Sequence, residues 1–176
     1  MSDVIQAILS RRSVRRFTGE PISEGQLTSL LRAGMAAPSA HNSQPWRMLT
    51  ISNRERMETL IPLTPWWGML KTASAAIVIC ADLSCGDYNP KAIAAGCYAA
   101  MQNMLLAAHA MELGAVWLGI NQGDPGYDRF CELLKIPQNF EVVGMIAIGH
   151  PAEEAKPRED RFDSGKWRCE YWEHSN

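Results

Sequence analysis

The spacing of apolar side chains predicts helices and strands that alternate in the first half of the chain. Apolar residues lie on one helical face over residues 3–9, and they return at helical spacing after Ser23. Ser23 and Gln26 form a capping box, which marks the start of a second helix. Short apolar stretches at 46–51 and 75–81 predict buried strands with a helix between them.

The second half of the chain predicts one long helix, two more strands and a further helix. Residues 91–113 are dominated by Ala, Met and Leu, and Gly96 is their only glycine or proline. Such a stretch is typical of a central helix that is buried almost all round. Residues 115–120 and 141–148 predict strands, and residues 125–134 predict a helix between them. Helices and strands are therefore expected to intermingle along the chain.

Composition narrows the classes of protein that fit this pattern. The chain has 176 residues, of which 47% are apolar and 20% charged, so we expect a single packed domain over residues 1–176. A formal charge of −2 disfavours a nucleic-acid partner. The longest apolar stretch, 73–81, is far shorter than the roughly 18 residues of a membrane span, and no export signal opens the chain. The five cysteines form no C-x-x-C pair and the four histidines share no ligand spacing, so we expect a cytoplasmic protein without a metal site.

Two groups of arginines could hold an anion such as a phosphate. The first follows the predicted N-terminal helix and consists of Arg11, Arg12, Arg15 and Arg16, with Ser13 among them. The second is Arg158 and Arg161 near the end of the chain. A guanidinium group can donate two parallel hydrogen bonds to a phosphate, and arginines from distant parts of a sequence often bind one phosphate together. The alternative is that the charged run simply faces solvent, which is the more common case.

Residues 37–46 form a predicted loop between a helix and a strand that is rich in small polar side chains. Asn42 and Gln44 each offer donors and acceptors that could read the edge of a planar heterocycle. The alternative is that the loop only ends one element and begins the next. Gly119, at the end of a predicted strand, would allow the backbone to approach a ligand closely.

Together these motifs resemble those of the FMN-dependent nitroreductase family. The resemblance rests on RRSVRRF at 11–17, APS at 37–39 and NSQPW at 42–46, and it continues in the expected order through 117–119 and 148–154. It implies an α+β fold with a mixed central sheet flanked by helices. It also implies a homodimer whose extended termini wrap the partner subunit, with FMN at the interface.

The activity that the resemblance implies is a hydride transfer from NADH or NADPH, through FMN, to a small-molecule electron acceptor such as a quinone or nitroaromatic. The donor and the acceptor would use the flavin in turn, by a ping-pong mechanism, and no catalytic acid or base is expected because the cofactor carries the chemistry. The alternative is an FMN-binding protein that stores the cofactor or senses redox state, with only incidental turnover.

The resemblance also implies which residues bind FMN. Arg11 and Arg15, with Arg158 or Arg161, would hold the phosphate, while other members would meet the ring or the ribityl chain. Four segments supply the expected set, and in one of them Pro38, Ser39 and Asn42 would reach the flavin from the partner subunit. The set is Arg11, Arg12, Ser13, Arg15, Pro38, Ser39, Ala40, Asn42, Gln44, Leu118, Gly119, Arg158 and Arg161.

Two positions depart from the family pattern. Ala40 stands where relatives often have a serine, so one hydroxyl contact is expected to be missing. Trp66 and Trp67 stand where relatives carry polar residues near the flavin pyrimidine. These two rings either roof the substrate site or belong to the ordinary core.

Overall fold

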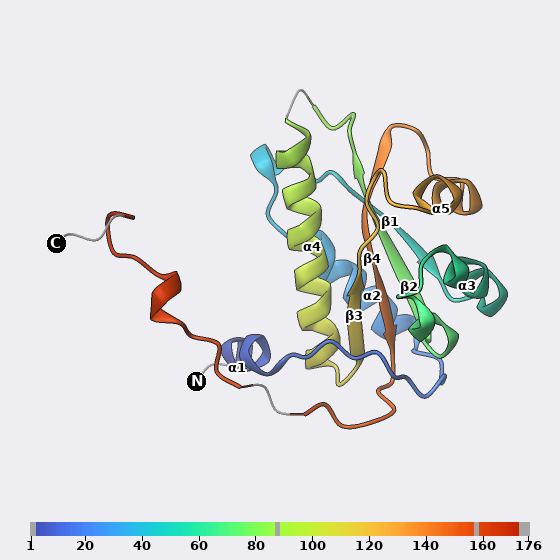
Figure 1. Ribbon diagram of the computed structural model, residues 1–176, viewed down its shortest axis with the longest axis horizontal. Helices are drawn as coiled ribbons and strands as arrows, with labels where there is room; N and C mark the ends of the chain where they lie inside the picture. Colours follow the sequence, from blue (N-terminus) through green and yellow to red (C-terminus); the bar gives the residue numbers. More distant parts are fainter. Residues whose placement is uncertain (1–2, 87–88, 157–158, 173–176) are drawn as a thin grey trace.

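A four-stranded antiparallel sheet forms the centre of the computed structural model, which describes residues 3–86, 89–156 and 159–172. The strands are β1 (Trp46–Ile51), β2 (Ala75–Asp82), β3 (Gly114–Leu118) and β4 (Phe140–Gly149), in the spatial order β1-β2-β4-β3 (Figure 1). β2 and β3 run in the same direction, but β4 lies between them and is antiparallel to both. The α+β class is confirmed, whereas the expected mixed sheet is wrong for the described residues, because β4 separates the two strands that could have paired in parallel.

Helices cover both faces of this sheet (Figure 1). The helices are α1 (Asp3–Ser10), α2 (Glu24–Met35), α3 (Arg54–Leu60), α4 (Pro90–Ala110) and α5 (Tyr127–Leu134). One core lies between the sheet and the pair α2 and α4, and a second core lies on the opposite face under α3 and α5. The predicted capping box is present, because the Ser23 and Gln26 side chains each accept from the other residue's backbone N–H.

The side chains of β2 alternate between the two cores. Ile77 and Ile79 pack against α4, while Val78 and Cys80 pack toward α3 and α5. Successive side chains of a strand point to opposite faces, so a strand covered on both faces is apolar at nearly every position. This burial explains why β2 is a continuous apolar run in the sequence rather than an alternating one.

The central helix α4 ends three residues before the predicted boundary. Glu112 adopts a left-handed conformation with φ of 59°, and Leu113 N–H donates to the Ala108 carbonyl at 2.8 Å, which closes the helix. Gly114 is therefore the first residue of β3. Although α4 is 21 residues long, no helix in the described part of the chain has both the length and the apolar character needed to cross a membrane.

The N-terminal helix α1 and part of the C-terminal arm lie beside each other, outside the sheet. The C-terminal arm, residues 150–156 and 159–172, follows β4 and passes α1 before its end extends away from the sheet (Figure 1). Ile8 and Leu9 of α1 line a cavity of about 560 Å³ with residues 159–162 of the arm. None of the residues of α1 is buried, and Trp167 and Trp172 of the arm are largely exposed.

Candidate functional site

The arginine segment, residues 11–17, is held between β3 and the start of the C-terminal arm. Val14 N–H donates to the Ala115 carbonyl at 3.0 Å, and Ala152 N–H donates to the Arg16 carbonyl at 3.0 Å. Phe17 is buried in the core under α3 and α5, with Val14 packed against the same core, so these two side chains anchor the segment from below. The backbone is thus fixed by the sheet while Arg15 and Arg16 remain exposed to solvent.

The structure brings the two arginine groups together. One cavity of about 260 Å³ is lined by Arg11, Arg12, Ser13, Arg15 and Arg161. Arg161 comes from the C-terminal arm, whereas Arg158 lies outside the described residues. Arg16 does not line this cavity, because its guanidinium pairs with Glu153 at 3.3 Å and borders a neighbouring hollow. The convergence of positive charge on one hollow makes it suited to a phosphate.

Arg15 also lines a second cavity, which is mostly apolar. This cavity has a volume of about 460 Å³ and is bordered by Arg15, Trp66, Trp67, Met69, Trp117, Leu118 and Gly119. A Cβ atom placed on Gly119 would meet nothing within 4 Å, so the space above this residue is open. We call the first hollow the arginine cavity and the second the apolar cavity.

These two adjoining cavities fit the parts of FMN. The arginine cavity offers donors that match a phosphate, and the apolar cavity offers a broad apolar surface for a flat ring. Arg15 belongs to both, so one ligand could extend from the first to the second. The open backbone at Gly119 adds a place where a ring can approach without meeting a side chain.

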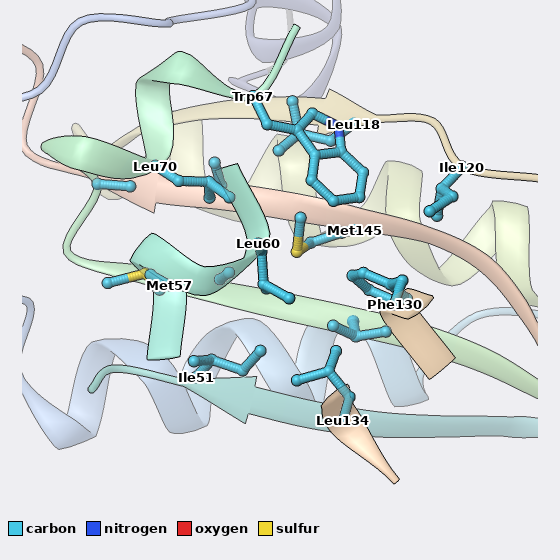
Figure 2. Close-up of a cluster of buried hydrophobic side chains, with 14 of the residues drawn as sticks. Ile51, Met57, Leu60, Trp67, Leu70, Leu118, Ile120, Phe130, Leu134 and Met145 are labelled. Carbon is cyan, nitrogen blue, oxygen red and sulfur yellow. The ribbon is translucent and has the colours of Figure 1, made fainter. Parts of the chain in front are cut away.

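The two neighbouring tryptophans have different environments. Trp67 is 1% exposed and meets Phe130 edge-on at 5.5 Å between ring centroids, so the core interpretation holds for it (Figure 2). Trp66 is 78% exposed and lines the apolar cavity. The sequence did not separate these roles, because the two residues are identical and adjacent.

The loop of residues 39–44 is the second segment that the sequence singled out, and its backbone is strained. His41, Asn42 and Gln44 have φ values of 48°, 56° and 48°, and they are three of the six non-glycine residues with positive φ in the described part of the chain. Left-handed backbone costs a non-glycine residue about 1–2 kcal/mol, and such strain concentrates at functional sites. Sequence reasoning missed this strain, because glycine, the usual residue for a left-handed backbone, occupies none of these positions.

Side-chain hydrogen bonds maintain this strained loop. Gln44 N–H donates to Ser39 Oγ at 3.0 Å, and Gln44 Nε2 donates to Asn42 Oδ1 at 3.2 Å. Arg47 Nη1 donates to the Gln44 carbonyl at 3.2 Å. The polar residues that suggested ligand recognition therefore also bond to one another and set the loop's shape.

An ion pair that sequence reasoning missed anchors the base of the loop. Arg47 Nη2 lies 2.8 Å from Asp82 Oδ2, and the Asp82 side chain is only 8% exposed. The Ser84 hydroxyl donates to Asp82 Oδ1 at 2.5 Å, and this bond lowers the pKa of the Asp82 carboxyl, helped by the charge of Arg47 and opposed by burial. The sequence signal that could have revealed this ion pair is Asp82 itself, a single charged residue directly after the apolar stretch 75–81.

The loop and the arginine segment lie at opposite ends of α4 (Figure 1). A Cβ on Gly96, in the first half of α4, would lie 3.1 Å from Ser39 Cβ. A Cβ on Gly114, just beyond the other end, would lie 2.7 Å from Val14 Cγ1. Within one chain, the structure therefore does not bring the 38–44 segment, with Pro38, Ala40 and its neighbours, to the arginines.

The remaining titratable candidates have structural roles. His109 Nε2 lies 2.7 Å from Ser10 Oγ, so this histidine of α4 is hydrogen-bonded to α1. Burial raises the pKa of Cys80 and Cys97 to about 12, so both thiols are neutral near pH 7. Among the residues that the structure describes, no three His, Cys, Asp or Glu side chains are grouped so that they could hold a metal ion.

Known proteins with similar sequences show the family of this chain. The profile of the nitroreductase family matches residues 8–65 and 62–150. A protein of Archaeoglobus fulgidus described as an NADH dehydrogenase/NAD(P)H nitroreductase is 35% identical over 174 residues, which cover 98% of this chain and 100% of that protein.

Solved structures give the same result. A protein of Parabacteroides distasonis, also described as an NADH dehydrogenase/NAD(P)H nitroreductase, superposes with a TM-score of 0.91 at 30% identity, covering 98% of this chain and 100% of that chain. A protein of Desulfovibrio desulfuricans described as a nitroreductase in complex with FMN has a TM-score of 0.78 at 36% identity, covering 92% and 94% of the two chains. The chain therefore belongs to the nitroreductase family of FMN-dependent NAD(P)H oxidoreductases.

Proposed function

We propose that this protein passes a hydride from NADH or NADPH to a quinone, a nitroaromatic or a similar planar acceptor. The observation that carries the proposal is the pair of adjoining cavities that share Arg15, one rich in arginine and the other apolar and open above Gly119. For a quinone, the overall reaction consumes NAD(P)H, one proton and the quinone, and it yields NAD(P)⁺ and the hydroquinone.

Each part of the proposed site has a distinct task. When bound, FMN supplies the hydride chemistry. Arg11, Arg15 and Arg161 hold its phosphate in this proposal, with Arg158 as a further candidate. Arg12 and Ser13, which line the same cavity as these arginines, would bind the ribityl chain or the ring edge.

Leu118 and Gly119 form the surface against which the ring packs. Gly119 is exposed, and a Cβ placed on it would meet nothing within 4 Å, so a ring can approach its backbone closely. One ring face then remains for NAD(P)H and the acceptor, and two planar molecules cannot stack on that face together. The nicotinamide therefore leaves before the acceptor enters, which is the physical basis of the proposed ping-pong order.

We further propose that a second copy of the chain completes the site with the partner's 38–44 segment. Three features support this assembly: the segment is strained, it lies far from its own arginine cavity, and the surface around α1 and the C-terminal arm is uncovered. Trp167, Tyr171 and Trp172 are 62%, 73% and 79% exposed, and large rings of this kind each bury about 150–250 Å² on packing. In this proposal Pro38, Ser39, Ala40, Asn42 and Gln44 contact the FMN of the other subunit.

The proposed function is tested by the cofactor and the kinetics of the purified protein. The protein should bind FMN, and its oxidation of NADH with 1,4-naphthoquinone should exceed that of free FMN and give parallel double-reciprocal lines. Turnover no faster than free FMN would favour the storage or redox-sensing alternative. Intersecting lines would contradict the ping-pong order, and a protein that does not bind added FMN would overturn the proposal.

A further inference from the structure

A third cavity adjoins the apolar cavity and is separate from the residues assigned to FMN phosphate binding. It has a volume of about 330 Å³ and is lined by residues 63–66, 119–120 and 124–125. Trp66 and Gly119 line both this cavity and the apolar cavity. The third cavity therefore opens beside the residue that faces the flavin ring in the proposed function.

The backbone that carries Trp66 is fixed from both sides. Trp66 N–H donates to Thr64 Oγ1 at 3.1 Å, which holds the turn before it. Trp67, the next residue, is buried between Leu118 and Phe130 in the core under α3 and α5 (Figure 2). With its neighbour anchored in this way, the Trp66 ring stays at the surface, where it presents a flat apolar face to the cavities.

Asp124 supplies the only charge among the side chains that line the third cavity. Its Oδ2 accepts from Asn121 N–H at 2.8 Å and from Asn121 Nδ2 at 3.2 Å, which fixes the carboxylate relative to the loop after Gly119. A fixed negative charge at the wall of a small cavity repels anionic ligands and tolerates neutral ones.

We propose that the third cavity is the binding site for the electron acceptor and that it selects uncharged planar aromatic molecules. The acceptor ring stacks on Trp66, which also lines the apolar cavity, so the acceptor reaches the ring face that the nicotinamide has left. The Asp124 carboxylate disfavours acceptors with an anionic substituent. This assignment rests on the proposed function, because it places the acceptor next to the ring of bound FMN. For a neutral quinone, the acceptor gains the hydride at this position and one proton from water, and it leaves as the hydroquinone.

The stacking role of Trp66 is tested with 1,4-naphthoquinone, a neutral planar acceptor. In the FMN-loaded protein, Trp66→Ala should raise the KM for this quinone about tenfold, and Trp66→Phe should restore most of the affinity because a phenyl ring still stacks. Leu83→Ala removes an exposed apolar side chain that lines none of these cavities and is the matched control. Quenching of protein fluorescence by the quinone, without NADH, should show the same order of affinities.

The charge preference is tested by comparing this quinone with 1,2-naphthoquinone-4-sulfonate, an anionic acceptor. Asp124→Asn keeps the shape of the side chain and removes its charge, so the KM for the sulfonate should fall about threefold or more while the KM for the neutral quinone changes little. Equal effects on both acceptors would overturn the charge selection.

The outcomes separate this proposal from the proposed function. Failure to bind FMN, or to turn over NADH, overturns the proposed function. Normal turnover with an unchanged quinone KM in Trp66→Ala overturns only the acceptor site. A Trp66→Ala protein that loses FMN affinity or changes its oligomeric state would assign Trp66 to cofactor binding or to the subunit interface, which also overturns the acceptor site.

Discussion

The arginine segment and the loop of residues 39–44 reach a defined shape by different means. Residues 11–17 are extended, and backbone hydrogen bonds join them to Ala115 of β3 and to Ala152 beyond β4. The loop has three non-glycine residues in left-handed conformations, and side-chain bonds from Ser39, Asn42 and Arg47 hold it. The first segment therefore depends on the sheet, whereas the second depends on a few polar side chains and tolerates less change.

This difference implies separate effects on FMN binding and on stability. The Arg15 side chain of the arginine segment is exposed and lines both cavities, so its removal should affect the ligand more than the fold. Side chains that support the loop bond mainly to the protein, so their removal should affect stability first. The predictions below test this separation, beginning with the largest expected effect.

Removal of the Arg15 side chain should weaken FMN binding about tenfold to one hundredfold. Arg15 lines both the arginine cavity and the apolar cavity, and a hydrogen bond to a charged group contributes about 1.5–3 kcal/mol. Arg15→Ala should leave the melting temperature of the apoprotein nearly unchanged, because the side chain is exposed. FMN titration by fluorescence and thermal unfolding measure the two effects.

Arg56→Ala, on the exposed surface of α3, is the control for this variant. Arg54 is unsuitable as a control, since its guanidinium donates to three backbone carbonyls within residues 70–73. If Arg15→Ala and Arg56→Ala bound FMN equally well, the assignment of Arg15 to the phosphate would be wrong.

A methyl group at Gly114 should destabilise the arginine segment from below. A Cβ there would lie 2.7 Å from Val14 Cγ1, so Val14 must move, and overpacking of this kind costs about 1–3 kcal/mol. We expect Gly114→Ala to lower both the free energy of unfolding and FMN affinity. Urea unfolding and FMN titration of the same preparations provide the measurement.

Gly119→Ala is the matched glycine variant with the opposite expectation. Its Cβ meets nothing within 4 Å, so the free energy of unfolding should be unchanged. FMN affinity should still fall, because the added methyl occupies the space where the ring is proposed to pack. Destabilisation by Gly119→Ala, or its absence in Gly114→Ala, would contradict this reading of the two glycines.

Loss of the Asp82 charge should destabilise the protein through the base of the loop. Asp82→Asn removes the partner of Arg47 and weakens the bond from Ser84, and disruption of a buried bond to a charged group costs about 1–3 kcal/mol. Urea unfolding near pH 7 should reveal this loss, while FMN affinity should change less than in Arg15→Ala. A variant as stable as the wild type would show that the ion pair does not support the loop.

The contribution of Asp82 should also depend on pH in a definite direction. The folded protein lowers the pKa of this carboxyl below its ordinary value of 3.8, so the stabilisation is fully present above that value. It is lost as the pH falls through the lower pKa of the folded state. The difference in unfolding free energy between wild type and Asp82→Asn should therefore be constant from pH 7 to about pH 5 and shrink below about pH 4.

Sequence patterns were sufficient to predict the helices and strands and to single out the arginine segment, because both depend on the spacing of neighbouring residues. The apolar run of β2 and the Ser23 capping box are written in neighbouring residues, and Arg11 and Arg15 lie within a few positions of each other. The antiparallel arrangement was not predictable, since the insertion of β4 between β2 and β3 is a long-range event.

Features that depend on contacts between residues far apart in the sequence could not be predicted for the same reason. The Arg47 to Asp82 ion pair joins two strands, and the different burial of Trp66 and Trp67 depends on which ring meets Phe130. Arg161 lines the arginine cavity, whereas Arg158 lies outside the described residues. The sequence alone could not bring either arginine next to residues 11–15, because they lie more than 140 positions apart. Residue type alone carries none of this information.

Removal of the Arg16 side chain should have the smallest effect, although Arg16 is the immediate neighbour of Arg15. Its guanidinium pairs with Glu153 at 3.3 Å, and the two side chains are 75% and 60% exposed, so solvent screens the pair. Exposed ion pairs of this kind contribute about 0–1 kcal/mol, and Arg16 does not line the arginine cavity. Arg16→Ala should thus keep FMN affinity within about twofold of wild type and change stability by less than about 1 kcal/mol. A loss of FMN affinity comparable to that of Arg15→Ala would mean that the phosphate site depends on the net charge of the segment and not on the arginines that face the cavity.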